Sequence, residues 1–207
     1  MKKDKNSQPT STRDLMILEA RGLFAKRGFY GASISQIAGM LGMTKQTLLH
    51  HFQTKEKLYG LVLEQIASEL VSLRPSSEEG TESSERLVDY FCALVADTPE
   101  DTERSQLLMR ELLDNPSRAD RTRKWPLGPF LKDLTEMTRA TPGWSNASDA
   151  RILAVIIQIL GSVHYYSVSE PTVRSIFGPD LAGSINAIYE QQLRVSIRAI
   201  LSAGAAS

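Results

Sequence analysis

Apolar residues recur at three- and four-residue spacing along most of the chain, and no stretch keeps the two-residue alternation typical of a strand. A stripe through Leu15, Leu18, Leu23 and Phe24 stops at Gly28, which predicts a helix over about residues 13–27. Similar stripes predict a helix over about residues 55–73 and a last long helix over about residues 180–203. The spacing predicts an all-α protein of about nine helices.

Two short capped helices joined by a glycine turn are predicted in the segment SISQIAGMLGMTKQTLLHHFQTKEK. Ser33 and Gln36 have the spacing of a capping box, so one helix begins just after Ser33. Gly42 suits the left-handed turn that ends this helix, and Thr44 is an N-cap for the next. Thr54 caps a further helix. This order is typical of a helix-turn-helix, which predicts DNA binding.

The second of these short helices has distinguishable inner and outer faces. Leu48 and Phe52, four residues apart, give it an apolar stripe for packing. At about 100° per residue, Gln46 and His50 then point away from the core, towards a major groove. Lys45 lies in the first turn, and its long side chain can reach a phosphate.

These residues belong to a longer stretch, RDLMILEARGLFAKRGFYGASISQIAGMLGMTKQTLLHHFQTKEKLYGL, which resembles the N-terminal domain of TetR/AcrR transcriptional regulators. The resemblance covers about a quarter of the chain and includes the LF..RG, IA...G and T..TL..HF..K positions. It implies an N-terminal three-helix helix-turn-helix domain followed by a C-terminal helical domain for ligand binding and dimerisation. It also implies DNA contacts from Lys45, Gln46, Thr47 and Leu49, with Lys55 on the DNA backbone.

Two residues depart from the usual pattern of that family. Leu49 stands where tyrosine is usual, so a phosphate contact is lost, although leucine can touch a thymine methyl group. Gln46 stands where glycine is frequent, and its amide can bond adenine bidentately. The full set of expected DNA contacts also includes Ser33, Thr44, His50 and His51.

The charge is divided unevenly along a chain whose formal net charge is zero. Residues 1–60 hold 10 Lys or Arg against 4 Asp or Glu, a net charge of +6, and the remainder holds 14 against 20, a net charge of −6. A basic N-terminal part favours phosphate, although such asymmetry is also common between domains. We expect a disordered arm over residues 1–10, a DNA-binding domain over 11–57 and an effector-binding and dimerisation domain over 58–207.

A homodimer is expected for two reasons. The resemblance implies that the last two long helices pair with those of a second copy as a four-helix bundle. In addition, one helix in a groove reads few base pairs, at about 1–3 kcal/mol of discrimination for each good contact. The expected partner is therefore double-stranded DNA with a palindromic operator, whose half-sites lie about 34–36 Å apart or a multiple of that distance.

A ligand pocket in the C-terminal domain is a further hypothesis, based on aromatic residues interspersed with polar ones. The expected lining is Tyr90, Met109, Arg110, Trp125, Phe130, Gln158, His164 and Tyr165. Core packing is the alternative for each of the aromatic residues. Arg110 and His164, if buried, need partners: Glu111, a ligand carboxylate or a structural ion pair. The resemblance implies that a small apolar or amphipathic effector shifts the fourth helix and releases the DNA.

Other classes of function are disfavoured. The sequence has no HExxH, Walker, GxGxxG or GxSxG motif, and adjacent His50 and His51 diverge too far to grip one metal, so neither an enzyme nor a metal or cofactor is expected. The single cysteine, Cys92, suits a reducing cytoplasm, and neither a signal peptide nor a membrane-spanning stretch is expected. The prediction is a cytoplasmic, ligand-responsive repressor. An activator, or a DNA-localised regulator that binds another protein without a small effector, is the alternative.

Overall fold

The computed structural model describes residues 11–75, 82–95, 98–114 and 126–204, and within these ranges it contains nine α-helices and no strand. The all-α prediction is therefore confirmed. The helices are α1 (Thr12–Gly31), α2 (Ile34–Met40), α3 (Lys45–Phe52), α4 (Lys55–Ser72), α5 (Ser83–Ala93), α6 (Pro99–Asp114), α7 (Gly128–Arg139), α8 (Asp149–Phe177) and α9 (Pro179–Gly204).

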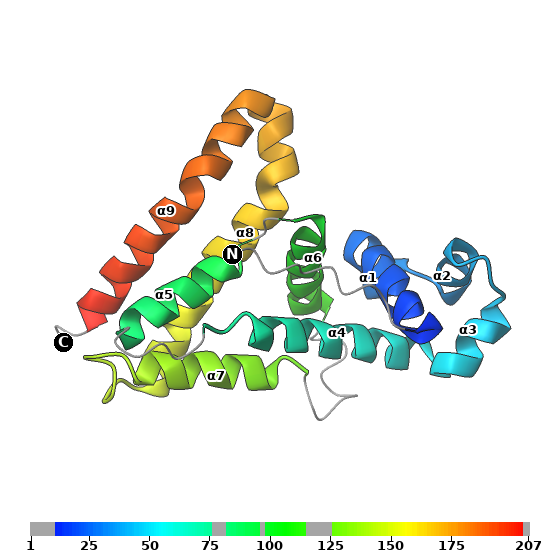
Figure 1. The fold of residues 1–207 in the computed structure, drawn as a ribbon, viewed down its shortest axis with the longest axis horizontal. Coiled ribbons are helices and arrows are strands. Elements are labelled where there is room, and N and C mark those ends of the chain that lie inside the picture. The colour runs from blue at the N-terminus through cyan, green and yellow to red at the C-terminus, as the bar shows by residue number, and fades with distance from the viewer. Residues whose placement is uncertain (1–10, 76–81, 96–97, 115–125, 205–207) are drawn as a thin grey trace.

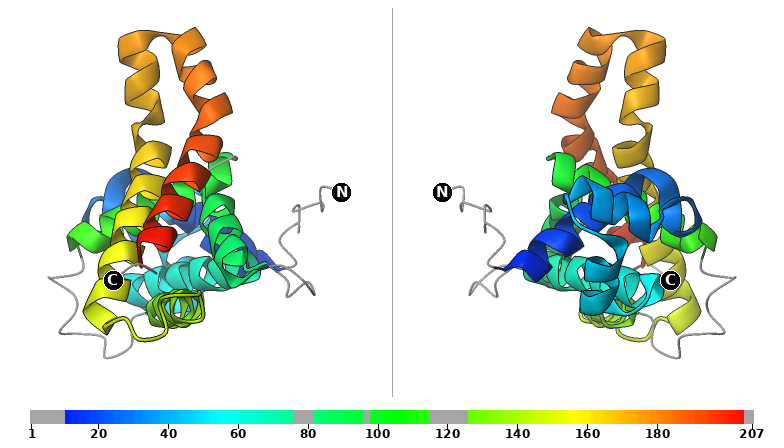
Figure 2. Two further views of the ribbon diagram at one scale, coloured as in Figure 1. Left: turned by 90° about the vertical axis from the view of Figure 1, so that its left-hand side faces the viewer. Right: turned by 90° about the vertical axis from the view of Figure 1, so that its right-hand side faces the viewer.

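The molecule is elongated, with α1, α2 and α3 at one end (Figure 1). We call these three helices, Thr12–Phe52, the head, and helices α5 to α9 the body. Helix α4 runs from α3 into the body, and α6 packs against α1. Helices α8 and α9 form an antiparallel hairpin whose far half projects beyond the other helices in both views of Figure 2.

The first helix is longer than its sequence pattern predicted. Ser11 caps α1 by accepting a hydrogen bond from the amide of Asp14. The helix was expected to end at Gly28, but it is kinked there and continues to Gly31. Gly28 has φ 70° and ψ 175°, a conformation that glycine adopts without steric cost. The kink sets the direction of the chain as it enters α2.

One continuous cluster of buried apolar residues runs from the head into the body. It includes Phe24 of α1, Leu58 and Leu70 of α4, and Ile156 of α8, each almost fully buried. Cys92 is buried in α5, as predicted, and burial raises the pKa of its thiol to about 11. The thiol is therefore protonated and unreactive at neutral pH.

The hairpin of α8 and α9 (Asp149–Gly204) carries much exposed apolar surface. Tyr166 and Tyr189 stack between the two helices with ring centroids 3.7 Å apart, and the Tyr189 hydroxyl donates to the Ser162 carbonyl at 2.7 Å. The exposed large apolar residues of the hairpin are Leu153, Ile157, Tyr165, Ile176, Phe177, Leu181, Ile188 and Val195.

Helix α8 corrects the expectation that no stretch is apolar enough to cross a membrane. By length and composition alone α8 passes that test, with 33% of its most apolar window buried inside the protomer. The continuously apolar run covers only residues 150–163, whereas the helix that contains it is 29 residues long. A core or interface helix of a water-soluble protein has the same composition, so this observation does not indicate a membrane protein.

Candidate DNA-binding site

The helix-turn-helix is built from local hydrogen bonds that its sequence specifies. The amide of Ser33 donates to Gln36 Oε1 at 3.0 Å, and the amide of Gln36 donates to Ser33 Oγ at 3.2 Å, which completes the predicted capping box. Gly42 turns the chain with φ 65°. Thr44 then accepts from the amide of Thr47 at 3.1 Å and so caps α3. These local predictions are confirmed.

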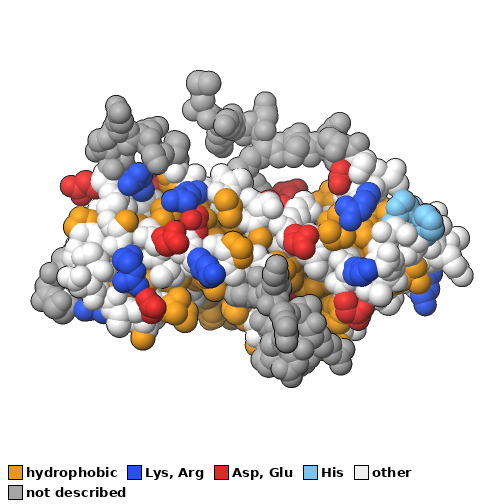
Figure 3. Space-filling model, turned by 90° about the horizontal axis from the view of Figure 1, so that it is seen from below, with side chains coloured by type: hydrophobic (Ala, Val, Ile, Leu, Met, Phe, Trp, Pro, Cys, Tyr) orange, Lys and Arg blue, Asp and Glu red, His pale blue; other side chains and the backbone are white. Residues whose placement is uncertain are grey.

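Helix α3 presents the faces that the spacing predicted. Leu48 and Phe52 are buried against the core, and Leu49 is half-buried at its edge. The exposed residues of the helix are Lys45, Gln46, Thr47, His50 and His51. In Figure 3, histidine side chains and basic side chains lie at the end of the molecule that carries α3. This end of the head can therefore approach DNA.

The hydroxyl groups of the two N-cap residues have part of their hydrogen-bonding capacity committed. Ser33 Oγ accepts from an amide, while Thr44 Oγ1 accepts from an amide and lies 2.9 Å from Thr47 Oγ1. A hydroxyl carries one donor and two acceptor sites. Ser33 can therefore still donate to a phosphate oxygen without giving up its cap.

Lys55 is placed differently from the expectation that it contacts the DNA backbone. Its ammonium donates to the carbonyls of Phe29 at 2.8 Å and Ala32 at 3.0 Å, and it lies 4.3 Å from the centroid of the Phe29 ring. These acceptors belong to the end of α1, which spacing within residues 33–57 cannot reveal. The Lys55 ammonium is therefore occupied by these two carbonyls in this structure.

A strained turn joins α3 to α4, and no sequence pattern predicted it. Gln53 has φ 64° and ψ −54°, and the amide of Thr54 donates across it to the carbonyl of Phe52 at 2.7 Å. This is a γ-turn of the rare, strained form. The Gln53 side chain also accepts a hydrogen bond from the Lys57 ammonium.

Gln53→Gly is expected to stabilise the protein by about 1 kcal/mol, because glycine adopts this backbone conformation without strain. The measurement is the free energy of unfolding in urea at one fixed protein concentration. Gln46→Gly is the matched control, since Gln46 lies inside α3, where glycine costs about 1 kcal/mol. A loss of stability at both positions would contradict the assignment of strain.

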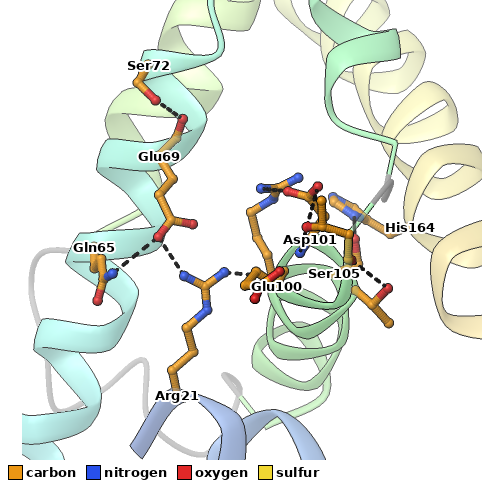
Figure 4. Close-up of polar contacts among 11 residues, drawn as sticks. Arg21, Gln65, Glu69, Ser72, Glu100, Asp101, Ser105 and His164 are labelled. Atoms are coloured by element: carbon orange, nitrogen blue, oxygen red, sulfur yellow. Dashed lines mark hydrogen bonds and ion pairs between the residues drawn. The ribbon is translucent and has the colours of Figure 1, made fainter. Parts of the chain in front are cut away.

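Buried polar side chains connect the head to α4 and α6. Arg21 of α1 is only 3% exposed and donates to Glu69 Oε1 of α4 at 2.5 Å and to the carbonyl of Glu100 in α6 at 2.9 Å. Figure 4 shows Arg21 reaching between those two helices. The signal in the sequence was a charged residue within the apolar stripe of α1, and it was missed.

Two neighbouring residues of α6 add further connections to the head and to α4. Arg110 donates to the carbonyl of Ala25 at 2.7 Å and to that of Lys26 at 2.8 Å, both in α1. Buried Glu111 accepts from the Tyr59 hydroxyl of α4 at 2.8 Å. The partner of Arg110 is thus the end of a helical segment, not Glu111 or a ligand, which corrects its assignment to a pocket.

The remaining residues of the expected pocket do not gather around one cavity. Tyr90 is fully buried, donates to the carbonyl of Leu70 at 2.8 Å and packs edge-to-face with Phe130. Gln158 and Tyr165 are exposed on α8, Tyr165 by 69%. Met109 is half-buried, and Trp125 lies outside the described residues. Helical spacing identified apolar faces but could not place them against one another.

Two surface hollows lie elsewhere in the body. The larger, of about 390 Å³, lies where α5 begins and α9 ends, and the smaller, of about 240 Å³, lies between the end of α4, α5 and α7. The larger is lined by Glu82, Ser84, Glu85, Val88, Thr141, Pro142, Arg198, Leu201 and Ser202. Neither hollow includes a residue of the expected pocket.

His164 lies in a buried polar cluster between α8 and α6. Its Nδ1 is 3.3 Å from Ser105 Oγ (Figure 4). Arg104, which pairs with Asp101 at 2.5 Å, belongs to the same cluster. Burial, together with the charge of Arg104, lowers the pKa of His164 to about 4. The imidazole is neutral at pH 7 and has a protein partner. No group of three metal-ligating side chains occurs among the described residues.

A capped helix-turn-helix with an exposed second helix, on an all-α body, defines a DNA-binding regulator of the helix-turn-helix class. Residues 17–62 match the family model of bacterial regulatory proteins of the tetR family. Residues 81–200 match that of the C-terminal domain of the HTH-type transcriptional dual regulator CecR. The chain belongs to the TetR family of transcriptional regulators and is not an enzyme.

Relatives and solved structures agree with this assignment. The HTH-type transcriptional regulator RutR of Escherichia coli K12 is 25% identical over 203 residues, covering 95% of this chain and 94% of RutR. The repressor KstR2 of Mycolicibacterium smegmatis is 38% identical over 63 residues, covering 30% of this chain and 31% of KstR2. A transcriptional regulator from Rhodococcus sp. Rha1 shares the fold, with a TM-score of 0.66 at 17% identity over 93% of this chain and 97% of that one.

Proposed function

We propose that the protein is a cytoplasmic repressor that binds a palindromic operator as a homodimer. The observation that carries the proposal is the exposed row of polar side chains on α3, held by a completed capping box and two threonine caps. The proposed DNA contacts are Ser33, Thr44, Lys45, Gln46, Thr47, Leu49, His50 and His51. The division into a DNA-binding domain and an effector-binding, dimerising domain is also proposed, with its boundary at residue 57 lying inside α4.

The hairpin of α8 and α9 is the proposed dimer interface. Its exposed apolar residues occur along both helices. A large exposed apolar surface is unusual for a monomeric soluble protein and is typical of an interface. Gly161 and Gly183 have open space where a Cβ atom would lie, which permits close approach of a second copy. Two copies related by a two-fold axis would present two α3 helices to a palindrome.

Control by a small apolar or amphipathic effector is the remaining part of the proposal. Arg110 and Glu111 of α6 bond to α1 and α4 respectively, so a ligand that moves α6 also changes the position of the head. A coupling of about 1–3 kcal/mol would lower operator affinity by roughly 5- to 150-fold. Repression needs no further contact, because a dimer on a promoter obstructs polymerase.

A regulator that acts without a small effector, as an activator or by binding another protein, is the second candidate. It is favoured by the packing of Tyr90 and Phe130 against each other rather than around a cavity. The two candidates predict different results when compounds are screened for release of operator DNA from the purified protein. A compound that releases DNA supports the first, and persistent binding across apolar, amphipathic and polar compounds supports the second.

The test of DNA binding is selection of bound fragments from sheared DNA of the source genome at about 0.15 M salt, followed by sequencing. Enrichment of a palindrome is the expected result. A protein with Lys45, Gln46 and Thr47 all replaced by alanine is the control, since these exposed side chains do not pack in the core. Equal enrichment by both proteins, or enrichment of no sequence by the wild type, would overturn the proposal.

Substitutions on α3 should separate base contacts from phosphate contacts. Gln46→Ala is expected to relax base preference at one position of each half-site, by about 1–3 kcal/mol, without changing the salt dependence. Lys45→Ala is expected to weaken binding to all sequences and to flatten the plot of log affinity against log salt by about 0.9 for each lost contact. Fluorescence anisotropy on matched and mutated operators measures both effects. Identical behaviour of the two variants would show that the assignment is wrong.

A further inference from the structure

The ammonium group of Lys55 has a defined environment at the base of the helix-turn-helix. It donates to the carbonyl oxygens of Phe29 and Ala32, 2.8 Å and 3.0 Å away, and lies over the Phe29 ring. The ring is itself packed edge-to-face against Tyr59. A cation beside the last carbonyls of a helix and over an aromatic face is stabilised by both.

The capping box explains why these two carbonyls are available. The amide of Ser33 bonds to the Gln36 side chain and not to the carbonyl of Phe29, four residues before it. The amide of Gln36 likewise bonds to Ser33 Oγ and not to the carbonyl of Ala32. The same local sequence that begins α2 therefore leaves two acceptors for Lys55.

The position of the two partners along the chain gives the contact its consequence. Ala32 directly precedes the N-cap of α2, and Lys55 is the first residue of α4. Residues 33–54, which contain α2 and α3, lie between the two partners, so the contact joins the two ends of this segment. We propose that Lys55 is a positioning residue, which holds the recognition helix α3 in its DNA-binding orientation by fastening the α1 end to the α4 start, and does not bind phosphate.

The first experiment measures lysine reactivity in the wild-type protein without DNA. Reductive methylation followed by peptide mass spectrometry is expected to modify Lys55 about tenfold more slowly than exposed Lys45, because its ammonium is hydrogen-bonded in the free protein. A residue kept free for phosphate would instead react as fast as Lys45 and become protected only after operator is added. That result would overturn the proposal, and it requires no variant to fold.

The second experiment compares Lys55→Met, which keeps an apolar side chain near Phe29, with Lys45→Met. Hydrogen exchange of DNA-free Lys55→Met should be about tenfold or more faster for amides within residues 33–54, with α8 amides unchanged. Its operator affinity should fall about 10- to 100-fold with the salt slope of the wild type. Lys45→Met should leave exchange unchanged and reduce the slope by about 1.8 for a dimer.

Of these experiments, only the affinity measurement depends on the proposed DNA-binding function. Unchanged exchange over residues 33–54 in Lys55→Met, or a slope reduced by about 1.8, would overturn the positioning role. If the wild type bound no operator, the proposed function would fail, while the reactivity and exchange measurements would still decide the role of Lys55.

Discussion

Ile157→Glu is expected to split the proposed homodimer into monomers and to abolish tight operator binding. Ile157 is 67% exposed on α8, within the apolar surface of the hairpin. Because the dimer is two-fold symmetric, this one substitution places two carboxylates in the interface, one from each protomer. Unpaired charges are strongly unfavourable there. We expect the dimer dissociation constant to rise about 1,000-fold, equivalent to about 4 kcal/mol. Sedimentation velocity over a range of protein concentrations measures this change.

Operator affinity should fall with the dimer, by about 100-fold or more, because one α3 helix then binds without its partner. Leu113→Glu is the matched control, since Leu113 is 78% exposed on α6, outside the hairpin. It makes the same change from an apolar residue to a carboxylate and should leave the mass of the particle unchanged. A fully dimeric Ile157→Glu protein would place the interface elsewhere.

The wild-type protein should lose about 3 kcal/mol of stability through His164 as the pH falls from 6.5 to 4. Burial and Arg104 lower the folded-state pKa to about 4 from the ordinary value of 6.5, so the unfolded chain binds the proton more tightly. The stabilisation is complete above about pH 6.5 and is lost as the pH falls towards 4. Urea unfolding at fixed protein concentration, at pH 7.5 and 4.5, measures the difference.

His164→Gln removes this titration while retaining a polar side chain that can bond to Ser105. Its stability should depend less on pH than that of the wild type over the same range, and carboxylates that titrate in both proteins cancel in the comparison. His50→Gln, at an exposed site on α3, controls for the general loss of a histidine. Parallel pH profiles for the wild type and His164→Gln would show that the imidazole is not held neutral by burial.

The parts of the site that could be predicted from the sequence are those that depend on neighbouring residues. Ser33, Gln36, Thr44 and Thr54 form their cap bonds within three residues along the chain, so their residue types and spacing were sufficient. The inner and outer faces of α3 follow from helical periodicity in the same way.

The parts that could not be predicted depend on contacts between distant segments. Arg110 and the α1 carbonyls are more than 80 residues apart, and nothing near Arg110 in the sequence identifies those acceptors. Lys55 was expected to follow its family's pattern, yet its ammonium bonds to carbonyls 23 and 26 residues earlier. Tyr165 is an aromatic residue of α8 that was expected to line a pocket but is exposed. Which side of α8 faces the body depends on tertiary packing.

The pair Arg110 and Glu111 has a consequence for the design of chimeric regulators. One residue of the pair bonds to α1 and the other to α4, so α6 is matched to the helices on which it rests. A hybrid that joins a foreign operator specificity to this body by exchange within α4 would replace the α1 surface while keeping α6. Such a hybrid would keep both contacts of α6 only if the transplanted α1 placed the same acceptors beside Arg110, and exchange of residues 45–51 alone would avoid that requirement.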